Sequence, residues 1–290
     1  MFENASVMVL LQGKEKLEIC KIETDKKAQA AICKSYAEAS GWMLKGTEYV
    51  SFDGNYSPDA DETLCINQFA LDEIIKEAVE TPAGVESFAP ENTNSDNIKA
   101  IFVGEICEGR MVIAFQKFKK EQYISVKGIN LFFDRDTFVQ EKRFGITISD
   151  EVDCIYEDGR LLFKSFFMAR QIFSLMKYYR EATQGEVERF TQMKELSLDS
   201  AEMFIGQADS RVRKKVASIM DSGVLERFSA RDIQKIGRQA GIDVAIRDKK
   251  IVIPAEKKKM KIILGFLDEE VYKGSFSNIT YITNSKRSVR

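Results

Sequence analysis

The sequence predicts an α+β protein, with a strand-rich amino-terminal half built from antiparallel hairpins and a helical, basic carboxy-terminal half with a small β-hairpin. Apolar residues before residue 165 form short runs between turn-forming residues, whereas from Ser165 onward they recur with the 3.6-residue period of helices. The charged residues are also unevenly distributed along the chain, because residues 205–290 hold 19 Lys and Arg against 10 Asp and Glu. We therefore expect two regions: 1–164, strand-rich and acidic, and 165–290, helical and basic.

The first hundred residues combine strands and helices. A short apolar run near the start predicts a buried strand rather than a signal peptide, because no basic segment precedes it. Small apolar residues over 28–39 predict a helix that ends at Gly41. Residues 57–64 and 80–97 are rich in Pro, Asp, Glu, Asn and Ser and predict loops, and residues 69–79 between them predict a second helix.

Residues 98–165 predict antiparallel strands. Ile98–Ile106 and Met111–Phe115 flank Cys-Glu-Gly-Arg, which is typical of a hairpin turn. A further apolar run begins at Leu131. Two later runs flank Asp158-Gly159, and Asp-Gly between apolar runs is a strong hairpin signal because a type I′ turn needs positive φ at both central residues.

From Ser165 onward the pattern predicts helices. Ser165 is the expected cap of a helix whose inner face runs from Phe166 to Met176 and can include Tyr179. Ser229 and Asp232 match a capping box. The remaining expected elements are helices near 185–194, 199–207, 209–223 and 229–241, a hairpin formed by 244–246 and 251–253, and a last helix with Met260, Ile263, Leu264 and Leu267 inward.

The composition excludes several kinds of chemistry. The chain contains no His, so Ser-His and Cys-His nucleophilic catalysis and imidazole-ligated zinc sites are closed to it. Its five Cys form no C-x-x-C pair, which favours reduced thiols in the cytosol. No apolar stretch is long enough for a transmembrane helix. We expect a cytoplasmic protein that is not an enzyme and needs no cofactor or metal.

Basic residues recur at helical spacing in the second region. Arg211, Lys214 and Lys215 lie opposite the apolar positions of one expected helix, and Arg231 and Lys235 begin a similar stripe on the next. Such stripes could neutralise DNA phosphates, although an ordinary solvated helix face gives the same pattern. The expected DNA-binding residues are Arg211, Arg213, Lys214, Lys215, Arg231, Lys235, Arg238, Lys257, Lys258, Lys286 and Arg287.

Two other interpretations remain open. Asp150, Glu151, Asp153, Glu157 and Asp158, followed by Lys164, could hold magnesium for phosphodiester cleavage, although several of these residues have turn or strand positions. Alternatively, the basic face could dock an acidic protein surface, which would make the chain a non-catalytic interaction module.

Long segments of the second half resemble one protein family. They are residues 131–134, 150–183, 210–225, 241–254 and 281–287, and they are similar to KwaB, a component of the two-gene Kiwa anti-phage defence system. The resemblance implies a cytosolic DNA-binding protein of bacterial immunity. It also implies a membrane partner, KwaA, that senses infection and could recruit the protein to the inner membrane. From the charge division we further expect a homodimer or higher oligomer.

Overall fold

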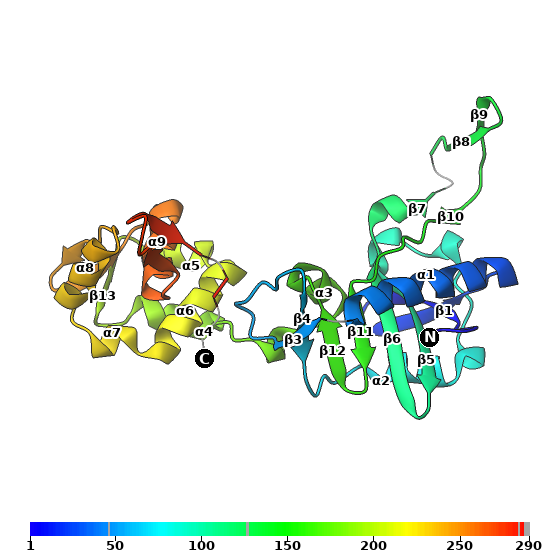
Figure 1. Ribbon diagram of the computed structural model, residues 1–290. Helices are drawn as coiled ribbons and strands as arrows, with labels where there is room; N and C mark the ends of the chain where they lie inside the picture. Colours follow the sequence, from blue (N-terminus) through cyan, green and yellow to red (C-terminus); the bar gives the residue numbers. More distant parts are fainter. Residues whose placement is uncertain (46, 126–127, 284, 287–290) are drawn as a thin grey trace. The chain divides into compact units, whose positions relative to one another are not determined.

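The computed structural model describes residues 1–45, 47–125, 128–283 and 285–286 (Figure 1). The chain forms two compact units. The first comprises Met1–Phe52 and Ser57–Leu175, and the second comprises Asp53–Tyr56 and the chain from Met176 onward. The predicted α+β class is confirmed, with an antiparallel-rich sheet in the first unit and mostly helices in the second.

An eight-stranded sheet forms the body of the first unit. Its strands pair antiparallel throughout, except that β3 and β4 run parallel. The strand order is β2 (Leu17–Ile22), β1 (Val7–Gln12), β5 (Ile98–Cys107), β6 (Arg110–Lys117), β11 (Cys154–Glu157), β12 (Arg160–Phe163), β4 (Glu62–Ile66) and β3 (Glu48–Ser51).

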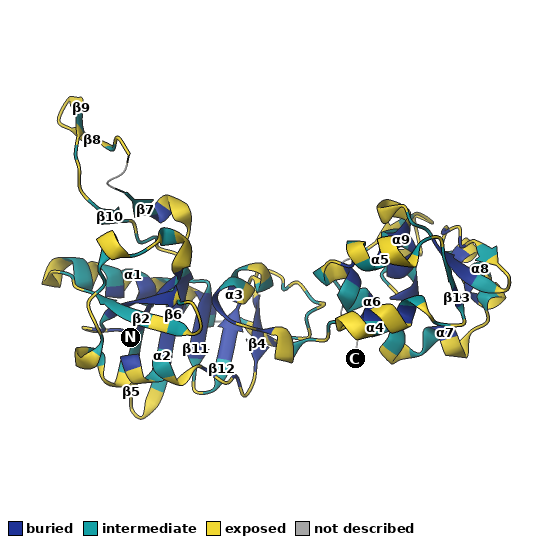
Figure 2. Ribbon diagram, turned by 180° about the vertical axis from the view of Figure 1, so that it is seen from behind, coloured by how far each residue is buried: buried dark blue, intermediate teal, exposed yellow. Residues whose placement is uncertain are grey.

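Helices cover both faces of this sheet. On one face, α1 (Lys26–Leu44) packs Tyr36 against β1 and β5, and burial raises the pKa of the Tyr36 hydroxyl, which donates to the carbonyl of Ile101 at 3.3 Å. On the other face lie α2 (Glu73–Glu80) and α3 (Phe166–Ile172). The central strands are therefore buried on both sides, as Figure 2 shows.

A hairpin arm stands apart from the body of the first unit (Figure 1). It consists of β8 (Leu131–Asp134) and β9 (Thr137–Gln140), and it is inserted between the two strands of a short pair, β7 (Tyr123–Ile124) and β10 (Gly145–Ile146). The rings of Phe133 and Phe138 pack on each other across the hairpin and remain mostly exposed. Short 3-10 turns complete the connections at Pro82–Gly84, Pro90–Asn92, Ser95–Asn97 and Lys120–Gln122.

The second unit packs its helices around a three-stranded sheet of order β13-β15-β14, in which β13 and β15 run parallel. Its core combines residues of every long helix, including Val187, Val216, Ile233 and Leu264. The elements are a 3-10 turn at Met176–Tyr178, α4 (Gln184–Thr191), β13 (Leu196–Leu198), α5 (Ala201–Gln207), α6 (Ser210–Ser222), α7 (Val224–Arg227), α8 (Ala230–Gln239), β14 (Ile246–Arg247), β15 (Lys250–Ile253), α9 (Lys257–Leu267), β16 (Val271–Lys273) and β17 (Thr280–Ile282).

Local signals in the sequence identified several turns and caps correctly. Asp158 and Gly159 both have positive φ between β11 and β12, as the predicted hairpin requires. The capping box of α8 is present, because the Ser229 hydroxyl accepts from the backbone of Asp232 at 3.2 Å and the Asp232 carboxylate accepts from Ser229. The Ser165 hydroxyl likewise caps α3.

Three predicted boundaries were wrong because tertiary contacts outweigh local signals. Helix α1 continues past Gly41 to Leu44, since Met43 is buried in a cluster with Ile155 and Leu162. Part of the expected loop 57–64 belongs to β4, which pairs with β12. Helix α2 begins at Glu73 rather than near residue 69.

The helix that begins at Ser165 ends at Ile172, short of the expected Met176. Phe173 then takes an extended conformation and packs its ring 4.9 Å from that of Phe115 and 5.3 Å from that of Phe69. This contact holds α3 in the first unit, which therefore ends at Leu175 rather than at residue 164.

The space around Gly104 in β5 and around Gly41 in α1 predicts opposite effects when each glycine is replaced by alanine. A Cβ at Gly104 would lie 2.6 Å from a methyl group of Val79, whereas a Cβ at Gly41, inside α1, would meet nothing within 4 Å. Gly104→Ala should lower the free energy of unfolding by about 1–3 kcal/mol. Gly41→Ala should raise it by about 0.5–1 kcal/mol, because alanine restricts the unfolded chain. Urea unfolding followed by circular dichroism measures both, and equal effects would contradict this account of the packing.

Candidate nucleic-acid interface

In helix α6, the predicted DNA-binding residue Arg213 forms hydrogen bonds with neighbouring parts of the second unit. Arg213 is half-buried, and its guanidinium donates to the carbonyls of Ala208 at 3.0 Å and Ala182 at 3.2 Å and to the side chain of Gln184 at 2.6 Å. These bonds join α6 to the start of α4. Its donors are therefore largely engaged within the unit.

Lys214 holds the inserted segment Asp53–Tyr56 in the second unit. Its ammonium donates to the carbonyl of Gly54 at 2.9 Å and lies 4.4 Å from the ring centroid of Tyr179. Gly54 has a φ of +83°, and a Cβ there would lie 2.7 Å from the Tyr179 side chain. The close approach therefore requires glycine at this position.

Lys215 forms an ion pair with Glu270, which follows α9. The two side chains are only 13% and 15% exposed. The expectation that Lys214 and Lys215 point outward with Arg211 was therefore wrong. The face of α6 opposite its apolar stripe packs against other parts of the unit, a fact that the helical period alone does not reveal.

The stripe on α8 is the one that faces solvent. Ile233 and Gly237 bury one side of this helix, while Arg231, Lys235 and Arg238 are exposed at i, i+4 and i+7. Within the described residues, none of these three cations forms a hydrogen bond or ion pair. Their charge is therefore available to an anionic ligand.

Among the predicted lysines at the start of α9, some are paired with an acidic residue of the second unit and others are exposed to solvent. Lys257 and Lys261 lie 3.5 and 2.9 Å from the carboxylate of Asp209, the cap of α6. Partial burial opposes ionisation of Asp209, but hydrogen bonds from Lys261 and the backbone of Val212 outweigh it and lower its pKa. Lys258 is exposed, as is Arg211, and neither has a polar partner within the described part of the chain.

The predicted cations of the tail are only partly described. Lys286 is half-buried, and its ammonium pairs with the carboxylate of Asp268 at 2.9 Å. Arg287 lies outside the described residues.

Sequence reasoning missed one exposed cation and one aromatic hairpin. The predicted hairpin near 244–253 is present as β14 and β15, and Asp248 and Lys249 form its turn, both with positive φ. Lys249 is exposed there but was not among the expected DNA-binding residues. The β16–β17 hairpin, which exposes Tyr272 and Tyr281, was missed because only three residues form each strand.

Four of the five carboxylates proposed for magnesium have partners in the first unit. Glu157 pairs with Arg160 at 2.5 Å, Glu151 pairs with Lys119 at 2.9 Å, and Asp158 accepts from the backbone of Met111. Burial raises the pKa of Asp153, although its carboxylate accepts a backbone hydrogen bond from Lys117 at 2.7 Å. Among the described residues, no group of three or more Cys, Asp and Glu side chains is placed to hold a metal ion.

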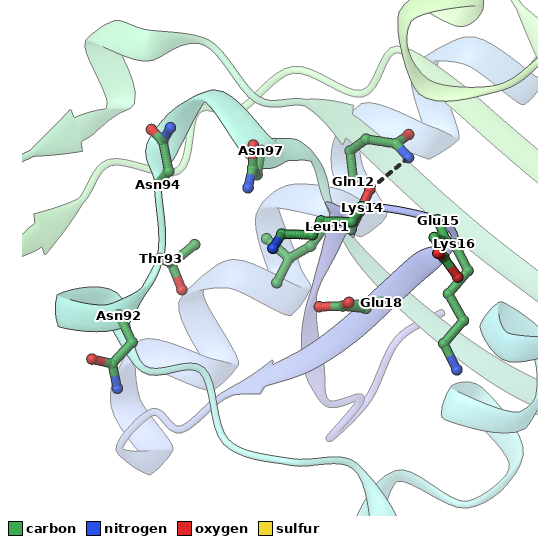
Figure 3. Close-up of a pocket in the computed structure, with 11 residues that line it drawn as sticks. Leu11, Gln12, Lys14, Glu15, Lys16, Glu18, Asn92, Thr93, Asn94 and Asn97 are labelled. Atoms are coloured by element: carbon green, nitrogen blue, oxygen red, sulfur yellow. Dashed lines mark hydrogen bonds between the residues drawn. The ribbon is translucent and has the colours of Figure 1, made fainter.

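A polar pocket of about 500 Å³ lies in the first unit, between the β1–β2 turn and residues 92–97 (Figure 3). Lys14 and Lys16 line it together with Glu15 and Glu18. Its formal charges therefore balance, and the amide and hydroxyl groups opposite them supply no further charge. The pocket shows no preference for an anion.

A model of the Kiwa protein KwaB-like family matches residues 95–280, which include the four central strands of the large sheet and nearly all of the second unit. The chain belongs to the KwaB-like family. The family is part of the Kiwa anti-phage defence system, which implies partner proteins such as KwaA. Comparisons with curated proteins and with solved structures gave no match. Among the described residues of this KwaB-like chain, no helix is long and apolar enough to span a membrane.

The Lys215–Glu270 pair predicts that charge reversal on α6 damages the fold. Lys215→Glu would place two carboxylates together at a site of low exposure, and breaking a buried ion pair leaves an uncompensated charge. We expect it to lower the free energy of unfolding by about 2–3 kcal/mol. Lys235→Glu, on the exposed face of α8, should change it by less than about 0.5 kcal/mol. Thermal and urea unfolding test this, and equal stability of the two variants would contradict it.

Proposed function

We propose that this KwaB-like protein binds duplex DNA through phosphate contacts made by exposed cations of its second unit. The observation that carries the proposal is the α8 stripe of Arg231, Lys235 and Arg238, whose charges have no ion-pair partner in the described chain. The second unit as a whole holds 23 Lys and Arg against 17 Asp and Glu, a net charge of +6. The first unit has the opposite sign, so a polyanion is attracted to the second.

The spacing of the stripe suits a phosphate backbone. Seven residues of helix rise about 10 Å, so Arg231 and Arg238 can engage different phosphates of one strand while Lys235 lies between them. Arg211, Lys249 and Lys258 provide further exposed cations in the same unit. Phosphate contacts carry no sequence information, and we therefore propose binding with little sequence preference.

We propose that binding is not accompanied by hydrolysis. The chain has no His, and two of the carboxylates considered for magnesium, Glu151 and Glu157, form ion pairs in the first unit. In this proposal the protein is a cytosolic effector of Kiwa that acts beside the membrane protein KwaA. It obstructs phage replication or transcription by occupying DNA.

A second role, as a protein-interaction module, is favoured by the β8–β9 arm of the first unit. Its residues Leu131, Phe133 and Phe138 are each more than half exposed, although a lone two-stranded hairpin is marginally stable in water. An exposed apolar surface of this kind is typical of a protein contact. The two roles are compatible because they use different units.

We expect a double charge reversal on α8 to abolish DNA binding. Lys235→Glu with Arg238→Glu removes two cations and adds two anions on an exposed face, so the fold should persist. At about 100 mM salt the affinity for duplex DNA should fall at least about tenfold, and the slope of log affinity against log salt should decrease by about two. Fluorescence anisotropy with two unrelated duplex sequences between about 50 and 200 mM salt measures this.

The matched control is Lys26→Glu with Lys27→Glu, two exposed lysines at the start of α1 in the acidic first unit. This variant should bind like the wild type. Equal binding by both variants would place the DNA site away from α8. Cleavage of the same duplex in magnesium would instead favour the nuclease alternative.

We also propose a homodimer, in which symmetric pairing widens the basic face. Light scattering at micromolar concentration should give twice the mass of one chain, and a monomer mass would contradict this.

A further inference from the structure

The β16–β17 hairpin presents an aromatic pair on the surface of the second unit. Val271–Lys273 pairs antiparallel with Thr280–Ile282, which places Tyr272 directly opposite Tyr281. The two rings are stacked, with centroids 5.5 Å apart and an interplanar angle of 23°, and the residues are 53% and 40% exposed. Their outer surfaces remain open to solvent.

The loop of this hairpin presents a third aromatic side chain. Phe276 is fully exposed and lies between Ser275 and Ser277. The loop is nevertheless ordered by hydrogen bonds, because the backbone of Gly274 donates to Ile279 at 2.9 Å and the Ser277 hydroxyl lies 3.2 Å from that of Tyr281. Phe276 therefore contributes almost nothing to the core, and its ring is accessible to a ligand.

The hairpin is attached to the end of α8. The Thr280 hydroxyl donates to the carbonyl of Ala240 at 2.7 Å, and Thr280 also fills the space beside Gly241. Arg238, the last cation of the α8 stripe, is two residues from Ala240. The hairpin that carries the aromatic pair is thus anchored within two residues of the last cation of the stripe.

We propose that the β16–β17 hairpin binds unpaired DNA bases by stacking, next to a phosphate backbone held by α8. This inference rests on the proposed function and extends it to DNA that contains single-stranded stretches. Every base has a π-face, so stacking on Tyr272, Tyr281 or Phe276 tolerates any sequence. The occupant is a base rather than an acidic protein surface because aromatic rings beside cations match both parts of a nucleotide.

Charge distinguishes this hairpin from the β8–β9 arm, which has a similar cross-strand aromatic pair. Residues 271–283 contain Lys273 and no Asp or Glu, so they do not repel a phosphate backbone. The arm carries Asp134, Arg135 and Asp136 at its turn, a net charge of −1, and belongs to the acidic unit. The arm therefore provides a matched control, since it exposes Phe133 on a hairpin of the same type.

The experiment uses the full chain with two probes, an intact duplex and the same duplex with a central single-stranded gap that contains 2-aminopurine. The wild type should bind the gapped probe at least about fivefold more tightly than the duplex, and stacking should change the 2-aminopurine fluorescence. Phe276→Ser and Tyr272→Leu should each reduce this preference and the fluorescence change while duplex affinity stays within about twofold. Phe133→Ser should behave like the wild type.

The outcomes separate this inference from the proposed function. If wild type binds both probes equally and the fluorescence does not change, base stacking is overturned while DNA binding stands. If neither probe is bound, the proposed function fails and the inference fails with it. If Phe276→Ser leaves both affinities unchanged but reduces the mass in light scattering, the hairpin is a contact between copies of the chain. That result also overturns base stacking.

Discussion

A cation that leaves water needs a partner, and this constraint decides which basic residues of the second unit are paired inside it and which face solvent. Arg213, Lys214 and Lys215 lie on the packed side of α6, where carbonyls, an aromatic ring and Glu270 compensate their charge. These contacts connect α6 to α4, to the inserted segment 53–56 and to the residues after α9. The internal cations therefore hold together the scaffold on which α8 is presented, and the cations of α8 remain available to a partner.

Features that depend on neighbouring residues could be predicted from the sequence. The turn at Asp158-Gly159 and the cap at Ser229 follow from backbone preferences that a few residues determine. The parallel pairing of β13 with β15 joins residues more than fifty positions apart, and the bond from Lys214 to Gly54 spans 160. Helical periodicity reports which residues share a face, but not whether another segment covers that face. For this reason the α6 stripe and the α8 stripe looked alike in sequence and differ in the structure.

The two units each carry a small hairpin with a cross-strand aromatic pair, at Phe133 and Phe138 in one and at Tyr272 and Tyr281 in the other. Neither hairpin is part of a larger sheet, so each leaves backbone edges and aromatic faces open. The two hairpins differ in the charge of the residues around them. The acidic turn of the first suits a protein partner, whereas the second lies in the unit with excess cations, where its rings can meet the bases of a nucleic acid.

In the proposed DNA site, the α8 cations and the aromatic hairpin make two contributions to affinity that differ in physical origin. Phosphate contacts by Arg231, Lys235 and Arg238 release counterions and weaken as salt rises, whereas stacking on Tyr272, Tyr281 and Phe276 depends little on salt. Thr280 bonds the carbonyl of Ala240, at the end of the same helix, so the hairpin is anchored beside that helix. A phosphate-binding helix alone would hold any duplex, including the host chromosome. The proposed stacking surface would add affinity only where bases are unpaired, as they are at replication forks and processed DNA ends, and it would let a protein that binds the phosphates of any sequence discriminate by DNA structure.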